Sequence, residues 1–201
     1  MSRDDRNNPA RRRLLAAGLA LPALMMPGVR ETFAQAGNLP ATPACGDAPT
    51  PKNMEGPFYK PRSPQRTSLL EPGIEGAKLM VTGYVLTKTC NPVQNAVLDF
   101  WHCDADGEYD NTGFRLRGHQ FTDAAGRYRL ETIVPGVYPG RTRHVHVKVQ
   151  AADGPLLTTQ LYFPGEPGNR SDFIFLPALL MNMSQANGTR LGRFDFVLDA
   201  G

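Results

Sequence analysis

From residue 79 onward the chain is a succession of short apolar runs separated by turn residues. The runs cover residues 79–87, 96–104, 126–134, 143–151, 156–163 and 192–200. Two of them alternate with a period of two, at Tyr128, Leu130 and Thr132 and again at Phe194, Phe196 and Leu198. Short runs with frequent turns predict an all-β fold, an antiparallel sandwich or barrel with few short helices. One such helix is expected near residues 178–185.

The segment before these runs differs in composition. Residues 37–78 are rich in proline and weakly periodic, which indicates an extended arm lying over the domain. The chain has 201 residues, of which 41% are hydrophobic and 20% charged, and this suits one globular domain with its own core. We therefore expect an arm at residues 37–78 and a β-rich core at residues 79–201.

The first 36 residues have the features of an export signal. Arg11–Arg13 precede an apolar run, Leu14–Met26, and an A-x-A site follows at Ala34–Ala36. The run is shorter than the roughly 20 residues that span a bilayer, so no membrane span is expected. The "RRRLL" pattern resembles a twin-arginine signal, although an ordinary Sec signal also has a charged start. Either signal predicts a periplasmic or secreted protein.

This signal carries the net positive charge of the chain. The whole chain has 22 basic and 19 acidic residues. The first 36 residues hold six arginines, two aspartates and one glutamate, so 22−6 = 16 basic and 19−3 = 16 acidic residues remain. A nucleic-acid-binding domain needs a basic surface. The neutral balance therefore argues against nucleic acid as a partner.

Two of the four histidines lie in the run "RTRHVHVKV" at residues 141–149. On a strand, His144 and His146 would share one face while the intervening valines point into the core. Alone, this pattern is typical of a polar strand face. A cupin would need a glutamate where Gln150 stands, and a copper–zinc superoxide dismutase needs more histidines. A carbonic anhydrase would need a third ligand such as His102 or His119.

Two tyrosines stand beside turns near these histidines. Tyr109 lies in "DADGEYD" and Tyr138 in "PGVYP". A bound cation lowers the pKa of a phenol strongly. Two phenolates with two imidazoles would form a hard, doubly anionic ligand set that suits iron(III). Taken singly, either tyrosine is equally typical of a core aromatic with a hydrogen-bonded hydroxyl.

Taken together, the motifs resemble those of the intradiol ring-cleavage dioxygenases, the non-haem iron(III) family of protocatechuate 3,4-dioxygenase and catechol 1,2-dioxygenase. The matching segments occur in the family's order: "EGPFY", "FWHCDADGEYD", "GHQFTDAAGRYRLETIVPGVYP", "RTRHVHV", "TTQLYFPGEP" and "FDFVLD". They extend over most of residues 55–199. The resemblance implies a β-sandwich core, in agreement with the strand pattern.

The resemblance also implies roles for individual residues. It assigns the iron(III) ligands to Tyr109, Tyr138, His144 and His146. It makes Arg141 a catalytic, substrate-binding residue and Tyr138 the ligand that takes up a proton from the substrate. Gln160 and Pro57 would line the substrate pocket. The implied reaction opens a catechol ring between its two hydroxylated carbons with O2, giving a muconic-type acid.

Two alternatives to a small-catechol enzyme remain. The chain could be an exported, non-enzymatic β-sandwich that binds a ligand without iron, since a fold does not fix a function. It could also be a dioxygenase that acts on a bulkier, polymer-linked catechol outside the cytoplasm, as the expected export suggests. Gly140 stands where some relatives carry tryptophan, which would enlarge the pocket. A homo-oligomer is compatible with the sequence. The helix-mediated dimer of the catechol dioxygenases is not expected, because their long helical region has no counterpart.

Three cysteines follow the signal: Cys45, Cys90 and Cys103. An oxidising compartment would allow one disulfide and one leftover thiol, with three possible pairings. We favour Cys45–Cys90, because Cys103 lies within the candidate site. Three separate buried cysteines are the alternative.

Overall fold

A computed structural model describes residue 45 and residues 48–199. The expected export signal, residues 1–36, lies outside the described residues, as does the beginning of the expected arm. Nine strands are described: β1 (Lys78–Thr87), β2 (Val97–Trp101), β3 (Arg117–Phe121), β4 (Arg127–Ile133), β5 (His144–Gln150), β6 (Leu157–Tyr162), β7 (Asn182–Ala186), β8 (Thr189–Arg193) and β9 (Phe196–Leu198). Two short 3-10 helices accompany them, η2 (Pro167–Arg170) and η3 (Pro177–Leu179). None of the described helices is long and apolar enough to cross a membrane.

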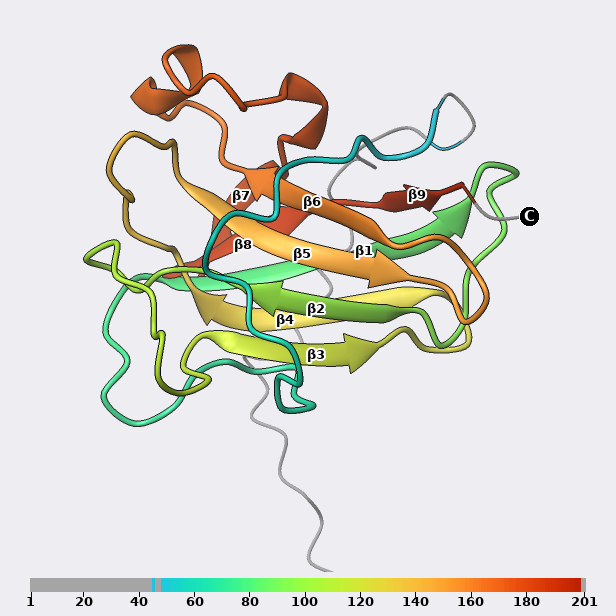
Figure 1. Ribbon diagram of the computed structural model, residues 1–201, viewed down its shortest axis with the longest axis horizontal. Coiled ribbons are helices and arrows are strands. Elements are labelled where there is room, and N and C mark those ends of the chain that lie inside the picture. Colours follow the sequence, from blue (N-terminus) through green and yellow to red (C-terminus); the bar gives the residue numbers. More distant parts are fainter. Residues whose placement is uncertain (1–44, 46–47, 200–201) are drawn as a thin grey trace, which may run out of the picture.

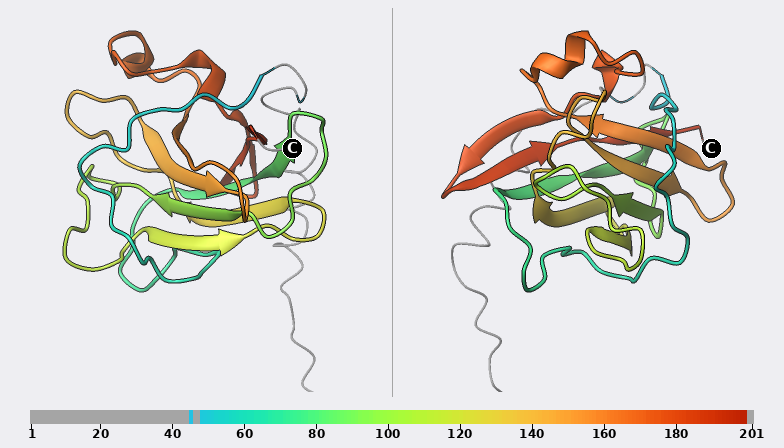
Figure 2. Two further views of the ribbon diagram at one scale, coloured as in Figure 1. Left: turned by 45° about the vertical axis from the view of Figure 1, so that its right-hand side comes forward. Right: turned by 60° about the vertical axis from the view of Figure 1, so that its left-hand side comes forward.

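The strands form two stacked sheets, which Figures 1 and 2 show as layers. One sheet has the order β3-β2-β5-β6, and the other β4-β1-β8-β7 with β9 paired to β1. The predicted all-β sandwich is therefore confirmed. One detail differs from the expected antiparallel pairing, because β8 and β9 both run parallel to β1.

The core lies between the sheets, and β5 shows how the sequence builds it. Val145, Val147 and Val149 are fully buried in the main apolar cluster. His144 and His146, at the alternate positions, lie on the outer face of the same sheet. The prediction that the valines and the histidines of this strand lie on opposite faces is thus confirmed.

The helix expected near residues 178–185 is wrong. Only Pro177–Leu179 form a helical turn, and Asn182–Ala186 form strand β7. Asn187 and Gly188 both have positive φ, of 49° and 75°, which suits the two-residue hairpin turn of an Asn-Gly pair. This turn pairs β7 with β8, and the hydrogen bonds of the ladder outweigh the local preference of the apolar run. Strand β3, which is short and largely polar, was not among the expected strands.

The described part of the arm crosses the outer face of the β3-β2-β5-β6 sheet (Figure 1). Asn53 N donates to Thr158 O on β6 at 2.9 Å, and Arg66 N donates to His119 O on β3 at 2.8 Å. Since these two strands are the edges of the sheet, the arm spans its full width. It therefore covers the face that carries His144 and His146.

A disulfide joins Cys45 to Cys90, with 5.6 Å between their Cα atoms, and Cys103 is free and buried. The bond closes a loop with a sequence separation of 45 residues. We expect Cys90→Ser to lower the free energy of unfolding by about 4 kcal/mol, because the open chain gains loop entropy when unfolded. Urea denaturation measures the loss. Cys45→Ser and the double variant should show the same loss, and additive losses would contradict a shared bond.

Candidate metal centre

The candidate site lies on the outer face of the β3-β2-β5-β6 sheet, where four strands carry one row of side chains. Trp101 on β2 and Gln160 on β6 both pair with His146 on β5, and Arg117 on β3 pairs with Trp101. The Trp101 ring stacks on the His146 ring at 4.8 Å and 5°. Gly56 of the arm lies against His146, since a Cβ there would be 3.4 Å from Cε1. Sheet and arm thus enclose the histidine from both sides.

Three potential donor atoms converge in this enclosure. His144 Nε2 lies 3.1 Å from His146 Nε2 and 3.5 Å from the Tyr109 hydroxyl. Two ligand atoms about 2.1 Å from one ion, at 90–110° to each other, lie about 3.0–3.4 Å apart. The two imidazole nitrogens are therefore spaced as ligands of one metal ion would be.

The protonation of the imidazoles also suits a metal. His144 Nδ1 lies 2.6 Å from Thr142 O, a carbonyl that can only accept, so Nδ1 carries the proton and Nε2 keeps its lone pair. Burial lowers the pKa of His144 to about 4, and it also lowers the pKa of His146 well below its usual value. His146 Nδ1 is buried and has no hydrogen-bond partner among the residues that the structure describes. Burying two imidazoles, one with an unsatisfied nitrogen, costs free energy. A metal ion would explain this arrangement, because it binds neutral imidazole nitrogens as ligands.

The tyrosines complete the candidate set. Tyr109 and Tyr138 lie edge to face with ring centroids 6.0 Å apart, and Phe58 of the arm stacks on Tyr109 at 4.3 Å. Burial raises the pKa of Tyr109 above its ordinary value, and Cys103 adds to the rise, while Arg141 and Arg117 oppose it. Among the described residues, no cluster of three or more His, Cys, Asp or Glu side chains could hold a metal. An ion here would therefore need phenol oxygens as ligands.

Two glycines allow the loops that carry Tyr109 and Tyr138 to pack closely against each other. Gly136 N donates to Asp104 O at 2.6 Å. A Cβ at Gly136 would lie 2.4 Å from Gly107 N, and one at Gly107 would lie 2.6 Å from Val137 O. Only glycine permits so close an approach of the two backbones. The relative position of Tyr109 and Tyr138 is therefore fixed by backbone contact.

Arg141 is held beside the imidazoles by a buried network. Its Nε donates to Asp172 Oδ2 at 2.9 Å and its Nη2 to Gln160 Oε1 at 2.7 Å. Tyr162 donates to the same Gln160 oxygen at 2.9 Å, and Gln160 Nε2 donates to Met54 O at 2.7 Å. The guanidinium is close enough to contribute to lowering the pKa of His144. This arrangement presents a fixed cation at the site.

The structure brings the candidate residues of the sequence to one place. His144 contacts His146 and Tyr109, and Tyr109 contacts Tyr138. Arg141 joins this group through Gln160, the strand partner of His146. Gln160 is buried, and its side-chain amide forms hydrogen bonds with Arg141, Tyr162 and Met54 of the arm. Pro57 is exposed and contributes through its neighbours, since Gly56 contacts His146 and Phe58 contacts Tyr109.

Two residues of the site were missed by sequence reasoning. Asp172 lies in an irregular segment, and Arg117 lies in the unpredicted strand β3. No periodicity or spacing marks either residue. A charged side chain between apolar neighbours, as at Arg117 beside Leu116, is the only local signal.

His102 and His119 have structural partners instead of metal contacts. His119 Nδ1 donates to Ser63 O at 2.7 Å, which anchors the arm. His102 is fully buried, with Nδ1 2.7 Å from Cys103 O and Nε2 2.7 Å from Thr132 Oγ1. Cys103 packs with Trp101 and Tyr109.

His102 makes stability depend on pH. Burial lowers its pKa from 6.5 to about 4, so the unfolded chain binds this proton first. We expect the stabilisation to be complete above about pH 6.5 and to fall by about 1.4 kcal/mol per unit as the pH drops towards 4. Urea unfolding of the iron-free protein at pH 7 and pH 4.5 measures the total slope, to which the buried His144 and His146 also contribute. The difference between the wild type and His102→Gln gives the share of His102. His102→Gln should have a smaller slope, and an unchanged slope would contradict the assignment.

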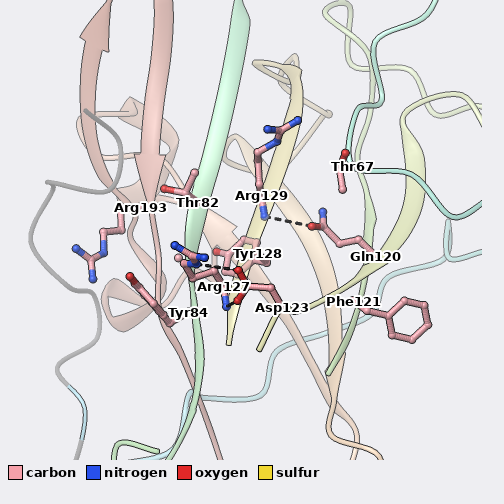
Figure 3. Close-up of a pocket in the computed structure, with 11 residues that line it drawn as sticks. Thr67, Thr82, Tyr84, Gln120, Phe121, Asp123, Arg127, Tyr128, Arg129 and Arg193 are labelled. Atoms are coloured by element: carbon pink, nitrogen blue, oxygen red, sulfur yellow. Dashed lines mark hydrogen bonds and ion pairs between the residues drawn. The ribbon is translucent and has the colours of Figure 1, made fainter. Parts of the chain in front are cut away.

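A pocket of about 530 Å³ lies away from the candidate site, between β1, β4, β8 and the edge of β3 (Figure 3). Gln120 reaches across it to accept a hydrogen bond from Arg129 N at 3.1 Å, which joins the edges of the two sheets. Three arginines line it, each with an acidic neighbour: Arg127 with Asp123, Arg129 with Glu131 and Arg193 with Asp195. Because these charges balance, the pocket does not indicate an anion site.

Comparison with known proteins gives consistent matches. A family model described as Dioxygenase matches residues 54–200. The protocatechuate 3,4-dioxygenase beta chain of Burkholderia cepacia is 36% identical over 118 residues, 50% of this chain and 50% of that protein. Catechol 1,2-dioxygenase 2 of Acinetobacter lwoffii is 29% identical over 188 residues, 81% of this chain and 66% of that protein. The chain thus spans about half to two thirds of the length of these relatives.

A solved structure matches over a larger share of its own length. It is the dioxygenase domain of a dioxygenase carbohydrate-binding protein fusion from the cellulolytic bacterium Streptomyces sp. SirexAA-E. Its identity to this chain is 58% and the TM-score is 0.75, with 77% of this chain and 100% of that chain covered.

Proposed function

The chain belongs to the intradiol ring-cleavage dioxygenases, and from this premise we propose that it opens a catechol-type ring between its two hydroxylated carbons with O2. The observation that carries the proposal is the convergence of His144 Nε2, His146 Nε2 and the Tyr109 hydroxyl, with His144 Nε2 within 3.5 Å of each of the other two atoms. The products would be muconic-type acids, which contain both atoms of O2.

The ligands would be His144, His146, Tyr109 and Tyr138, with non-haem iron(III) as the metal. Neutral imidazoles and hard phenol oxygens fit this ion better than softer metals. When bound, iron(III) supplies a Lewis acid that prepares the catechol for reaction with O2. The hydrogen bond from His144 Nδ1 to Thr142 O fixes the orientation of that ring, and the stack on Trp101 fixes His146.

The chain's own residues would handle the protons and the charge. A catechol must lose its hydroxyl protons on binding, and the Tyr138 oxygen is the proposed acceptor for one of them. Tyr138 suits this role because it is less buried than Tyr109. The Arg141 guanidinium, held by Asp172 and Gln160, would stabilise negative charge that develops on the opening ring. Phe58 would shield Tyr109 from water.

We also propose that the protein acts outside the cytoplasm, after twin-arginine export. The arginine-rich apolar start of the sequence supports this, and so does the Cys45–Cys90 disulfide, because such bonds persist in oxidising compartments. A bulkier or polymer-linked catechol is the second candidate substrate. The relative that is fused to a carbohydrate-binding protein in a cellulolytic bacterium favours it, as does the open space at Gly140, where a Cβ would meet nothing within 4 Å.

The test is to load the mature protein with iron(III) and follow O2 uptake with a panel of free and polymer-linked catechols. A visible tyrosinate-to-iron absorption, with one O2 consumed per ring opened, is the expected result. A colourless protein that consumes no O2 after reconstitution would instead support the non-enzymatic binding module.

A further inference from the structure

Arg117 is a buried cation that the proposed reaction does not use. Its residue is 1% exposed. The guanidinium donates to Asp110 O from Nε at 3.1 Å and from Nη2 at 2.9 Å, and to Phe58 O from Nη1 at 2.5 Å. No carboxylate of the described residues forms an ion pair with it. Within the described part of the chain, its hydrogen-bond acceptors are all backbone carbonyls.

Such a group is costly to bury. A charge removed from water is normally offset by a counter-charge, and carbonyl dipoles compensate it only in part. The guanidinium carbon lies 5.9 Å from the centre of the Tyr109 ring. Asp110, Tyr109 and Asp99 are the groups whose charges act on the guanidinium. Of these three, only Tyr109 belongs to the candidate site.

The two carbonyls that Arg117 binds belong to direct neighbours of Tyr109. Asp110 directly follows Tyr109 in the chain, so its carbonyl fixes the backbone of the ligand. Phe58 stacks on the Tyr109 ring at 4.3 Å and meets Tyr138 edge to face at 5.4 Å. A single guanidinium thus connects β3, the Tyr109 loop and the arm.

The loop between Tyr109 and Arg117 is held closed by Asp110. Its Oδ1 accepts from Thr112 N at 2.9 Å and Gly113 N at 2.7 Å, and its Oδ2 accepts from Arg115 N at 2.9 Å. These hydrogen bonds fold the loop back on itself, which brings Arg117 next to the Asp110 carbonyl. The loop therefore forms a compact unit whose position is set at Arg117.

We propose that Arg117 is a positioning residue for Tyr109, which it fixes through the Asp110 carbonyl and through the stacked Phe58 ring. This inference rests on the proposed function in one respect, that Tyr109 is an iron ligand. The placement of the Tyr109 ring itself does not depend on iron. The two parts can therefore be measured separately.

The test compares Arg117→Met and Arg117→Lys with Arg66→Met. Arg66 is the matched control, because it ties the arm to β3 through Arg117 O at 2.9 Å and to the same loop through Phe114 O. Among the described residues it has no hydrogen bond to Asp110 or Phe58, the two residues through which Arg117 would act. The first measurement is fluorine NMR of the iron-free protein with 3-fluorotyrosine at position 109. Arg117→Met should shift or split the single resonance, Arg117→Lys should give a smaller change, and Arg66→Met should leave it in place.

The second measurement is the tyrosinate-to-iron absorption and the retention of iron against a chelator. Arg117→Met should retain iron at least about tenfold less tightly, the loss typical of residues that orient ligands, and its absorption band should move. An unchanged fluorine resonance in Arg117→Met would overturn the proposal. If that variant fails to fold, Arg117→Lys decides by the same criterion. A wild-type protein without the iron band would refute the proposed function, while the fluorine comparison would still decide the role of Arg117.

Discussion

His146→Leu should abolish iron binding and, at the same time, leave the iron-free protein as stable as the wild type or more stable. His146 is 2% exposed, and within the described part of the chain its Nδ1 has no hydrogen-bond partner. An unsatisfied buried polar atom costs about 1–3 kcal/mol, and leucine removes it while filling most of the space. This gain offsets the lost hydrogen bond between the Nε2 atoms of His146 and His144 at 3.1 Å, which is worth about 0.5–1.5 kcal/mol. Because the loss of residues around a metal ligand costs about 10–100-fold, the loss of a ligand should exceed 100-fold in O2 uptake. Chelator titration, O2 uptake and urea denaturation measure the three effects.

His119→Leu is the matched control, with the opposite pattern. Its Nδ1 donates to Ser63 O at 2.7 Å, so its loss should cost about 1–2 kcal/mol of stability. Iron and its absorption band should remain. The site is wrongly assigned if His146→Leu keeps its iron, or if both variants lose iron and stability together.

The parts of this protein that sequence could predict are those set by local periodicity. Strand β5 has a period of two, so its valines and histidines could be assigned to opposite faces from that alternation alone. The helix near residues 178–185 was wrong because the Asn187–Gly188 turn, not the apolar run, decides the pairing of that segment. The candidate ligand set could be proposed only from the motif resemblance, since HxH alone does not distinguish a metal site from a polar strand face.

The residues that hold the site in place could not be predicted, because their partners are distant in sequence. Asp172 lies 31 residues from Arg141 along the chain, and Arg117 lies 59 residues from Phe58. Their contacts form only when the arm and the irregular segments fold over the sheet. Sequence patterns report on faces of strands, whereas these contacts depend on how loops pack over one face.

Asp172→Asn should slow ring opening by about 10–100-fold while iron stays bound, because Asp172 acts on the reaction only through Arg141. Its Oδ2 accepts from Arg141 Nε and Thr142 N, both at 2.9 Å, and its Oδ1 accepts from Ile174 N at 3.1 Å. Burial raises the pKa of Asp172. The hydrogen bonds from Thr142 N and Ile174 N, together with Arg141, outweigh burial, so the pKa lies below its ordinary value. The carboxylate is therefore ionised at neutral pH. An asparagine at this position has an NH2 group in place of one carboxylate oxygen. This NH2 group would face one of the N–H donors that now bind Asp172, and the guanidinium would no longer be held.

Arg141→Met should lower kcat by more, about 10²–10³-fold, the loss typical of removing one preorganised group that stabilises developing charge. The double variant then distinguishes positioning from an independent role. If Asp172 works only by orienting Arg141, Asp172→Asn should have no further effect on kcat once Arg141 is methionine. O2 uptake gives kcat for all three variants, and the tyrosinate-to-iron band reports whether the metal remains. A double variant slower by the product of the two single losses would mean that Asp172 contributes to the reaction without Arg141. A loss of the band in Asp172→Asn would instead place that carboxylate among the residues on which the metal depends.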